Sequence, residues 1–133
     1  MLISLGFYQR KPGLTHEQFS AWWRERHGPL IRNRPEVSCF IKRYVQHHIE
    51  PGRGFPGTQP LPFDGFSESW FESVEARQQM HAHPFFREQV IPDEANFIDM
   101  TQTRVLMFDH QVVQIGEDFG ARLFPGATDA WRT

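Results

Sequence analysis

The stretch Thr15-His-Glu-Gln-Phe-Ser-Ala-Trp-Trp-Arg-Glu-Arg-His-Gly-Pro-Leu-Ile31 predicts the first helix of the fold. Its large apolar side chains recur at intervals of three and four residues, which is the spacing of a helix face that packs against a core. They are Phe19, Trp22, Trp23, Leu30 and Ile31. His27 falls on the same face and is followed by Gly28 and Pro29. Because proline lacks a backbone N–H and clashes with the preceding turn, we expect the helix to kink or stop at His27.

The segments around this helix predict four strands and a second helical region. Thr15 and Gln18 have the spacing of a capping box, which marks the helix start, and we expect the helix to end near Arg32. The segments with the composition of strands are residues 2–9, 38–48, 65–71 and 103–113. The second helical region comprises residues 73–80, 83–90 and 92–97.

The order of these elements is β-α-β-β-α-β, the pattern of α+β domains with a ferredoxin-like fold. In this fold a four-stranded antiparallel sheet carries both helices on one face. Large side chains in residues 65–71 point to both faces of the predicted sheet, so the face without helices also needs cover. We therefore expect a homodimer in which two sheets pack face to face.

Length and composition limit the class of protein. The 133 residues predict one domain, residues 1–113, followed by an irregular arm, residues 114–133. The formal net charge of −2 gives no reason to expect nucleic acid or an anionic membrane as a partner. The single cysteine, Cys39, excludes an intramolecular disulfide. No signal peptide or membrane span is recognisable, so we expect a cytoplasmic protein.

Two other features of the composition bear on function. The 13 Phe and 4 Trp residues could fill a core or line a pocket for an apolar or aromatic ligand. Residues 49–64 are rich in proline and glycine and are too long for a tight hairpin. A loop of that length in a compact domain is usually functional or mobile.

His27 is the first candidate for chemistry. On an apolar helix face it is either a core residue whose ring nitrogens are satisfied by the backbone, or an acid/base group that works near neutral pH. On the second predicted strand, Tyr44 and Gln46 share one face and could donate hydrogen bonds to a substrate oxygen. For Tyr44, a packing role is the alternative.

Glu68 is the second titratable candidate. It lies between Phe66 and Trp70 on one face of the third predicted strand, and burial among aromatic side chains would favour its protonated form. It would then be an acid or base partner of His27. The alternative is a salt bridge to a basic side chain at the dimer interface.

Five segments of the chain, taken in order, resemble the EthD family of dimeric α/β-barrel proteins. They are Phe7–Trp23, His27–Leu30, Arg43–Gln46, Asp64–Phe71 and Asp93–Asp99. The resemblance implies a pocket between the sheet and its two helices, and it aligns His27 with the helix histidine of the family. Members of the family include methylmuconolactone isomerases, fungal dehydratases or decarboxylases of polyketide-like aromatics, and accessory proteins of oxidative degradation. The family therefore implies the fold more strongly than the substrate.

The resulting hypothesis is a small cofactor-independent lyase or isomerase that acts on a cyclic, oxygenated or aromatic metabolite. The expected catalytic residues are His27, as general acid/base, Tyr44 and Glu68. The expected substrate-binding residues are Gln46, Trp70, Phe66, Phe86, Phe97 and Trp23. The rival hypothesis is a binding or accessory protein that sequesters a hydrophobic aromatic compound, and a third is a structural dimer whose pocket is vestigial.

We expect neither a metal nor another cofactor. His81 and His83 have a spacing that suits metal ligands on a strand, but they fall at a helix end before Pro84. Haem occurs in other dimeric α/β barrels, but those domains are usually larger. Asp93, directly after Pro92, is expected to cap the short third piece of the second helical region.

Overall fold

A four-stranded antiparallel sheet forms the centre of the protein in the computed structural model, which describes residues 1–50, 52 and 54–126. The strands are β1 (Leu2–Tyr8), β2 (Arg43–His48), β3 (Gly65–Phe71) and β4 (Arg104–Phe108). Their order in the sheet is β2-β3-β1-β4, so the two central strands are β1 and β3. The α+β, ferredoxin-like arrangement that the sequence predicts is confirmed.

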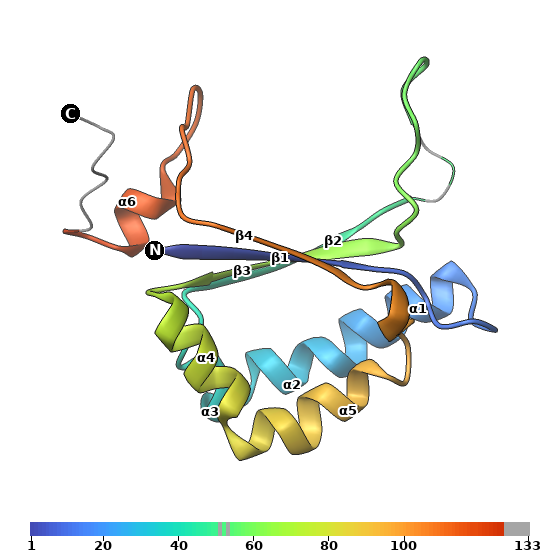
Figure 1. Cartoon of the computed structure of the whole chain (residues 1–133), viewed down its shortest axis with the longest axis horizontal. Coiled ribbons are helices and arrows are strands. Elements are labelled where there is room, and N and C mark those ends of the chain that lie inside the picture. Colours follow the sequence, from blue (N-terminus) through green and yellow to red (C-terminus); the bar gives the residue numbers. More distant parts are fainter. Residues whose placement is uncertain (51, 53, 127–133) are drawn as a thin grey trace.

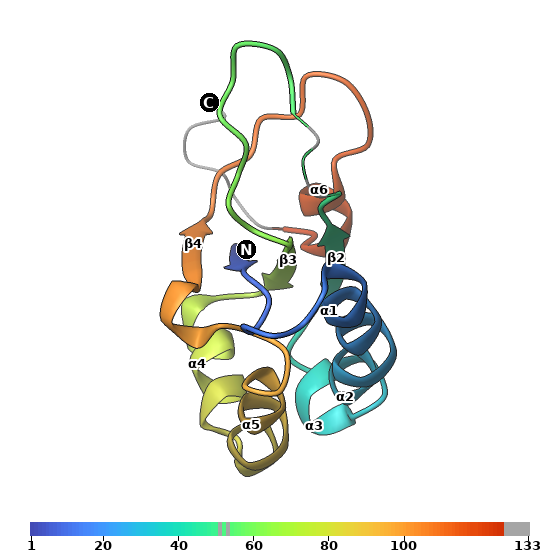
Figure 2. The same cartoon turned by 90° about the vertical axis from the view of Figure 1, so that its right-hand side faces the viewer.

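Two helical segments lie side by side on one face of the sheet (Figures 1 and 2). The first consists of α1 (His16–Trp22), η1 (Trp23–His27), α2 (Gly28–Arg32) and α3 (Pro35–Ser38). The second consists of α4 (Val74–Ala82), η2 (Phe86–Val90) and α5 (Ile91–Glu94). The predicted capping box is present at the start of α1, where the Gln18 N–H donates to the Thr15 hydroxyl at 3.1 Å and the Thr15 N–H donates to Gln18 Oε1 at 2.9 Å.

The first helix ends at Arg32, as predicted, but it continues through Gly28-Pro29 and does not stop at His27. It does so because residues Trp23–His27 form a wide π-helical turn, in which the Gly28 N–H donates to the Trp23 carbonyl five residues earlier. The wider turn accommodates the proline ring, which would clash with the carbonyl of an ordinary α-helix. η2 repeats this arrangement directly before Ile91-Pro92. π-Turns of this kind occur frequently at functional sites.

The predicted second strand, residues 38–48, is only partly correct. Pro35 occupies the first turn of α3, a position where its missing N–H costs nothing, and that helix extends to Ser38. The pairing of β2 with β3 begins only at Arg43. The fourth strand is likewise shorter than predicted and ends at Phe108. In residues 49–64, the described positions form neither helix nor strand.

The inner face of the sheet packs against both helical segments. The buried residues of this core include Phe19, Trp23, Val37, Phe71 and Val90, each at most 1 % exposed. Because side chains alternate along a strand, the same face also carries Tyr8, Tyr44, Gln46, Ser67 and Ser69.

The outer face of the sheet is partly covered by the C-terminal region. The short helix α6 (Phe119–Leu123) lies on the side of the sheet opposite to α1–α5 (Figure 1). Phe124 stacks on Trp70 with 6.4 Å between ring centroids, and Arg43 lies over the Phe119 ring at 4.4 Å. The predicted arm thus contains a helix, while its residues 127–133 lie outside the described residues. Within the described chain, every helix is too short or too polar to span a membrane.

Candidate active site

A cavity of about 260 Å³ lies between the inner face of the sheet and the two helical segments. Apolar side chains such as Ile31, Phe71, Met80 and Phe86 form part of its wall. Its polar and titratable lining comes from both the sheet and the helices. These side chains are Ser4, Tyr8, His27, Tyr44, Ser67, Ser69, Arg77, His81, Glu94 and Thr103.

His27 lines this cavity and is 4 % exposed. Its Nδ1 lies 2.9 Å from Oδ2 of Asp93, and the indole N–H of Trp22 donates to Oδ1 of the same carboxylate at 3.2 Å. Burial lowers the pKa of His27, and the hydrogen bond to Asp93 and its charge oppose that shift. A neutral imidazole that donates Nδ1–H to Asp93 keeps its Nε2 free to accept a proton.

Asp93 does not have the capping role that its position after Pro92 predicted. Val90 occupies the N-cap of α5, so Asp93 is inside the helix and its carboxylate faces the first helical segment. The π-turn η2 ends at Val90, three residues before Asp93, and the π-turn η1 ends at His27. The two widened turns therefore flank the hydrogen bond between the helical segments.

Phe97 packs against the His27 ring at 5.1 Å between centroids and is fully buried. It therefore supports the imidazole from behind and is absent from the cavity lining. Trp23 and Phe86 do line the cavity, as predicted for ligand contacts. Trp23 is 1 % exposed and Phe86 is 4 % exposed, so both are also core residues.

Glu94 is a titratable cavity residue that the sequence analysis did not single out. Burial, with a contribution from the neighbouring Asp93, raises its pKa to about 7. Its carboxyl group can therefore donate or accept a proton near neutral pH. The only signal in the sequence was its place beside Asp93 in a segment that resembles the EthD family.

Tyr8 was also missed, because a tyrosine at the end of a strand has no distinctive pattern. Its hydroxyl is 3.0 Å from the Ser67 hydroxyl on the inner face of the sheet. Burial raises the pKa of Tyr8 above its usual value, so the phenol stays protonated. Gly6 makes room for it, since a Cβ at this position would lie 2.2 Å from the Tyr8 hydroxyl oxygen.

Tyr44 and Gln46 lie on the predicted side of β2, and they tie the strand to the π-turn η1. The Gln46 side-chain amide donates to the Trp23 carbonyl at 3.0 Å and to the Tyr44 hydroxyl at 3.3 Å. Burial raises the pKa of Tyr44. Tyr44 lines the cavity, whereas Gln46 lines only a neighbouring groove.

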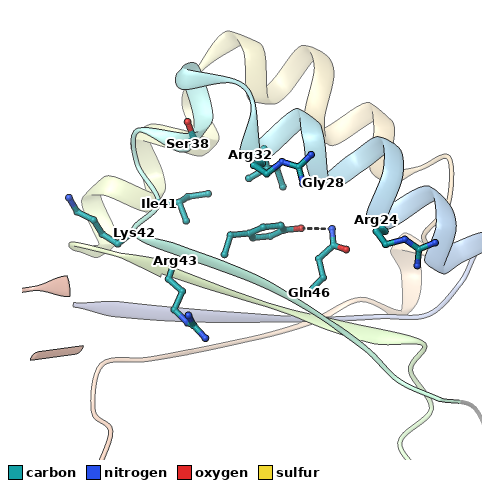
Figure 3. Close-up of a pocket in the computed structure, with 10 residues that line it drawn as sticks. Arg24, Gly28, Arg32, Ser38, Ile41, Lys42, Arg43 and Gln46 are labelled. Carbon is teal, nitrogen blue, oxygen red and sulfur yellow. Dashed lines mark hydrogen bonds between the residues drawn. The ribbon is translucent and has the colours of Figure 1, made fainter. Parts of the chain in front are cut away.

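That groove, of about 420 Å³, lies between the first helical segment and the edge strand β2 (Figure 3). Ile31, Ile41 and Tyr44 line both the groove and the cavity, so these three side chains separate the two spaces. The groove is bordered by basic residues, which are Arg24, Arg32, Lys42 and Arg43. In Figure 3 the Arg43 side chain extends away from the helices.

Glu68, Phe66 and Trp70 occupy the outer face of the sheet and do not face His27. In the sheet register, Glu68 lies opposite Leu5 and Val45. The residues next to these two, Gly6 and Tyr44, face the cavity, so Glu68 faces the other side of the sheet. Its carboxylate accepts the Trp70 indole N–H at 2.6 Å and lies 3.0 Å from Nε2 of His47. The structure therefore does not place Glu68 in one site with His27.

The expected protonation of Glu68 is also corrected. Burial alone would raise its pKa, but the hydrogen bonds from His47 and Trp70 and the charge of Arg43 outweigh burial and lower it. The Arg43 Nε lies 3.7 Å from the Glu68 carboxylate. The sequence left open a salt bridge of Glu68 to a basic side chain at the dimer interface; the structure shows ion pairs with His47 and Arg43 of the same chain.

His81 and His83 have different surroundings. His81 lines the cavity and contacts the Phe86 ring at 4.5 Å, while His83 Nδ1 accepts the Phe85 N–H at 3.1 Å. Among the residues that the structure describes, no group of three or more metal-ligating side chains comes together.

A ferredoxin-like sheet with two helical segments on one face, and an internal cavity lined by titratable side chains, defines a small α+β domain. The chain belongs to the EthD family, since the EthD domain matches residues 11–101. An EthD family protein from Bacillus halodurans has the same fold, with a TM-score of 0.61 and 17 % identity over 84 % of this chain and all of that one. A dimeric ferredoxin-like protein from Bacteroides fragilis has a TM-score of 0.60 and 10 % identity over 82 % of this chain and 95 % of that one.

Two fungal enzymes are similar in sequence. The dehydratase ustZ of Ustilaginoidea virens is 27 % identical over 112 residues, which cover 77 % of each chain. The decarboxylase AgnL1 of Paecilomyces divaricatus is 23 % identical over 113 residues, which cover 74 % of this chain and 70 % of the relative.

Proposed function

We propose that this protein is a small lyase that acts on a cyclic, oxygenated and largely apolar metabolite. The observation that carries the proposal is the His27–Asp93 pair, with Nδ1 of the imidazole held at 2.9 Å and the ring lining an internal cavity. The similarity to a dehydratase and to a decarboxylase supports the lyase class.

Both dehydration and decarboxylation need a side chain that transfers a proton to or from a specific atom of the substrate. In a dehydration, His27 would take a proton from the carbon next to a carbonyl group. Electrons of the broken C–H bond form the C=C bond, and the hydroxyl on the adjacent carbon leaves as water after protonation. Glu94, whose pKa is raised to about 7, is the acid that supports this second role.

In a decarboxylation, the C–C bond to the carboxylate breaks and CO₂ leaves. The electron pair remains on the ring carbon, which then receives a proton from protonated His27 or Glu94. Tyr44, whose hydroxyl accepts a hydrogen bond from Gln46, has its own O–H free to donate to a substrate oxygen. The proposal invokes no metal or other cofactor, because side chains of the protein supply every proton transfer that these eliminations need.

We propose further that the protein is a homodimer formed through the outer face and the β4 edge of the sheet. On the edge strand β4, Leu106 is 52 % exposed on the outer face, and Val105 and Met107, on the inner face, are 55 % and 47 % exposed. The ferredoxin-like protein from Bacteroides fragilis is described as dimeric, which supports a dimer but not a particular interface. Apolar side chains of this size on an edge strand are typical of surfaces that a partner covers.

The experiment is turnover of a panel of cyclic hydroxyketones and hydroxybenzoates by the wild-type protein and the His27→Ala variant, with loss of water or CO₂ detected by mass spectrometry. We expect turnover by the wild type and a loss of about 10²-fold or more in the variant. His83→Ala, outside the cavity, is the matched control. Equal turnover by the wild type and a folded His27→Ala variant would refute the role of His27. Binding without any product would favour a sequestering protein.

A further inference from the structure

We propose that Arg77 is an anion anchor in the cavity, and that the ligand therefore carries a carboxylate group on a small, largely apolar ring. This inference rests on the proposed function only in taking the cavity as the ligand site.

The position of Arg77 on α4 directs its side chain toward the cavity. Ala76 and Met80 pack against the main core, which fixes the face of α4 that meets the sheet. Arg77 and His81 lie next to them on the same helix face and line the cavity. Arg77 is half-buried, in contrast to Arg87 on η2, which is exposed and does not line the cavity.

The Arg77 guanidinium group has no ion-pair or hydrogen-bond partner among the residues that the structure describes. Several other arginines do have one: Arg10 pairs with Asp64 at 2.9 Å and Arg34 with Glu36 at 3.1 Å. A half-buried cation without a counter-ion pays a desolvation cost that a bound anion would offset. Arginine suits a carboxylate because its planar fork matches the two oxygen atoms.

The charge of Arg77 extends into the cavity. It lowers the pKa of Tyr8 against the larger effect of burial, and it also lowers the pKa of His81. The other charged side chain of the lining is Glu94, and burial and Asp93 raise its pKa to about 7. Glu94 is therefore a weak counter-ion, because it is partly neutral at physiological pH.

Hydroxyl groups on the inner face of the sheet line the same cavity as Arg77. Ser4 of β1 is paired in register with Ser69 of β3, and Ser67 lies two residues before Ser69. Ser4 and Ser67 are each 7 % exposed, and all three serines line the cavity. Hydroxyl donors in the same cavity as a guanidinium group can complete the hydrogen bonds that a buried carboxylate needs.

The size of the cavity limits the rest of the ligand. Its volume of about 260 Å³ is slightly below the ~300–1,000 Å³ of pockets for drug-sized ligands. The apolar part of the lining includes Trp23, Phe71 and Phe86. A single hydroxylated ring with one carboxylate matches this combination of size, apolar walls and one cation.

The test compares the binding of 2,4-dihydroxybenzoate with that of resorcinol, which has the same ring and hydroxyls but lacks the carboxylate. Trp23 lines the cavity, so tryptophan fluorescence can follow binding, and calorimetry provides an independent measurement. We expect the wild type to bind the benzoate at least tenfold more tightly than resorcinol. Arg77→Gln should abolish that preference and leave resorcinol binding unchanged, and Arg77→Lys should restore part of it.

Arg87→Gln is the matched control and should bind both probes like the wild type. Equal affinities of the wild type and a folded Arg77→Gln variant for 2,4-dihydroxybenzoate would overturn the inference. Failure of the wild type to bind any of the monohydroxy- and dihydroxybenzoates would also overturn it. Arg77-dependent binding with no turnover of any compound would refute the lyase proposal alone, and turnover that is insensitive to Arg77→Gln would refute the anchor alone.

Discussion

The His27 imidazole and the Asp93 carboxylate, 66 residues apart in the chain, meet at 2.9 Å between the two helical segments. His27 is the last residue of the π-turn η1, and Asp93 lies three residues after the end of the π-turn η2. A proline follows each of the two turns. The hydrogen bond to Asp93 favours the tautomer that carries its proton on Nδ1, in an imidazole that lines the cavity. This hydrogen bond links His27 on the first helical segment to Asp93 on the second.

Asp93→Asn should reduce turnover by about 10²-fold while the fold is retained. A neutral asparagine cannot stabilise the imidazolium as the carboxylate does. In the wild type, Asp93 opposes the lowering of the His27 pKa by burial, and the variant loses this opposing effect. We therefore expect the His27 titration, followed by NMR of its ring, to move to lower pH in the variant. Trp22→Phe, which removes one hydrogen bond to Asp93, should have a smaller effect. An unchanged His27 titration in Asp93→Asn would contradict the arrangement.

Glu94→Gln should change how stability depends on pH. The pKa of Glu94 rises from 4.5 to about 7 on folding, so the folded state binds the extra proton between these two values. Its stabilising contribution is complete below pH 4.5 and is lost as the pH rises through about 7. Urea unfolding at pH 5 and pH 8 should therefore show a wild-type loss of about 1–3 kcal/mol that Glu94→Gln lacks.

The opposite pH dependence of His27 is common to both proteins and cancels in this comparison. Glu88→Gln, at an exposed position of η2, is the control and should follow the wild type. Parallel pH profiles for wild type and Glu94→Gln would show that Glu94 titrates normally.

Gly6→Ala should destabilise the protein by about 1–3 kcal/mol. The new methyl group would lie 2.2 Å from the hydroxyl oxygen of Tyr8 and 2.6 Å from its ring carbon Cζ, so the phenol must leave its place beside Ser67. Thermal and urea unfolding measure the effect. Gly54→Ala is the control, because a Cβ there meets nothing within 4 Å. Equal stability of the two variants would be inconsistent with the described position of Tyr8.

Leu106→Glu should convert the proposed dimer to monomers. Leu106 is 52 % exposed on the outer face of β4, where a charge would be buried on association. Light scattering coupled to size-exclusion chromatography reports the mass directly. Leu61→Glu changes a side chain that is 60 % exposed in the loop before β3 and should leave the mass unchanged. A wild-type protein that is monomeric at high concentration would exclude the dimer.

The sequence by itself determined the local structure and the orientation of the first helix. The spacing of Phe19, Trp23 and Ile31 fixes which helix face is buried, and His27 is on that face by position alone. The capping box at Thr15 and the order of strands and helices are also local properties. Hydrophobic periodicity and caps are encoded in neighbouring residues, which is why the ferredoxin-like fold could be predicted from them.

Only the tertiary structure decided which residues share the site. Strand alternation groups Phe66, Glu68 and Trp70 on one face, but it does not say which face the helices cover, so the sequence could not decide whether Glu68 faces His27. Its lowered pKa depends on His47 of the neighbouring strand. The meeting of His27 with Asp93, and the enclosure of Glu94 and Arg77 in one cavity, arise from packing between helices distant in the chain. Burial and charge at a site are properties of the assembled layers, and no local pattern encodes them.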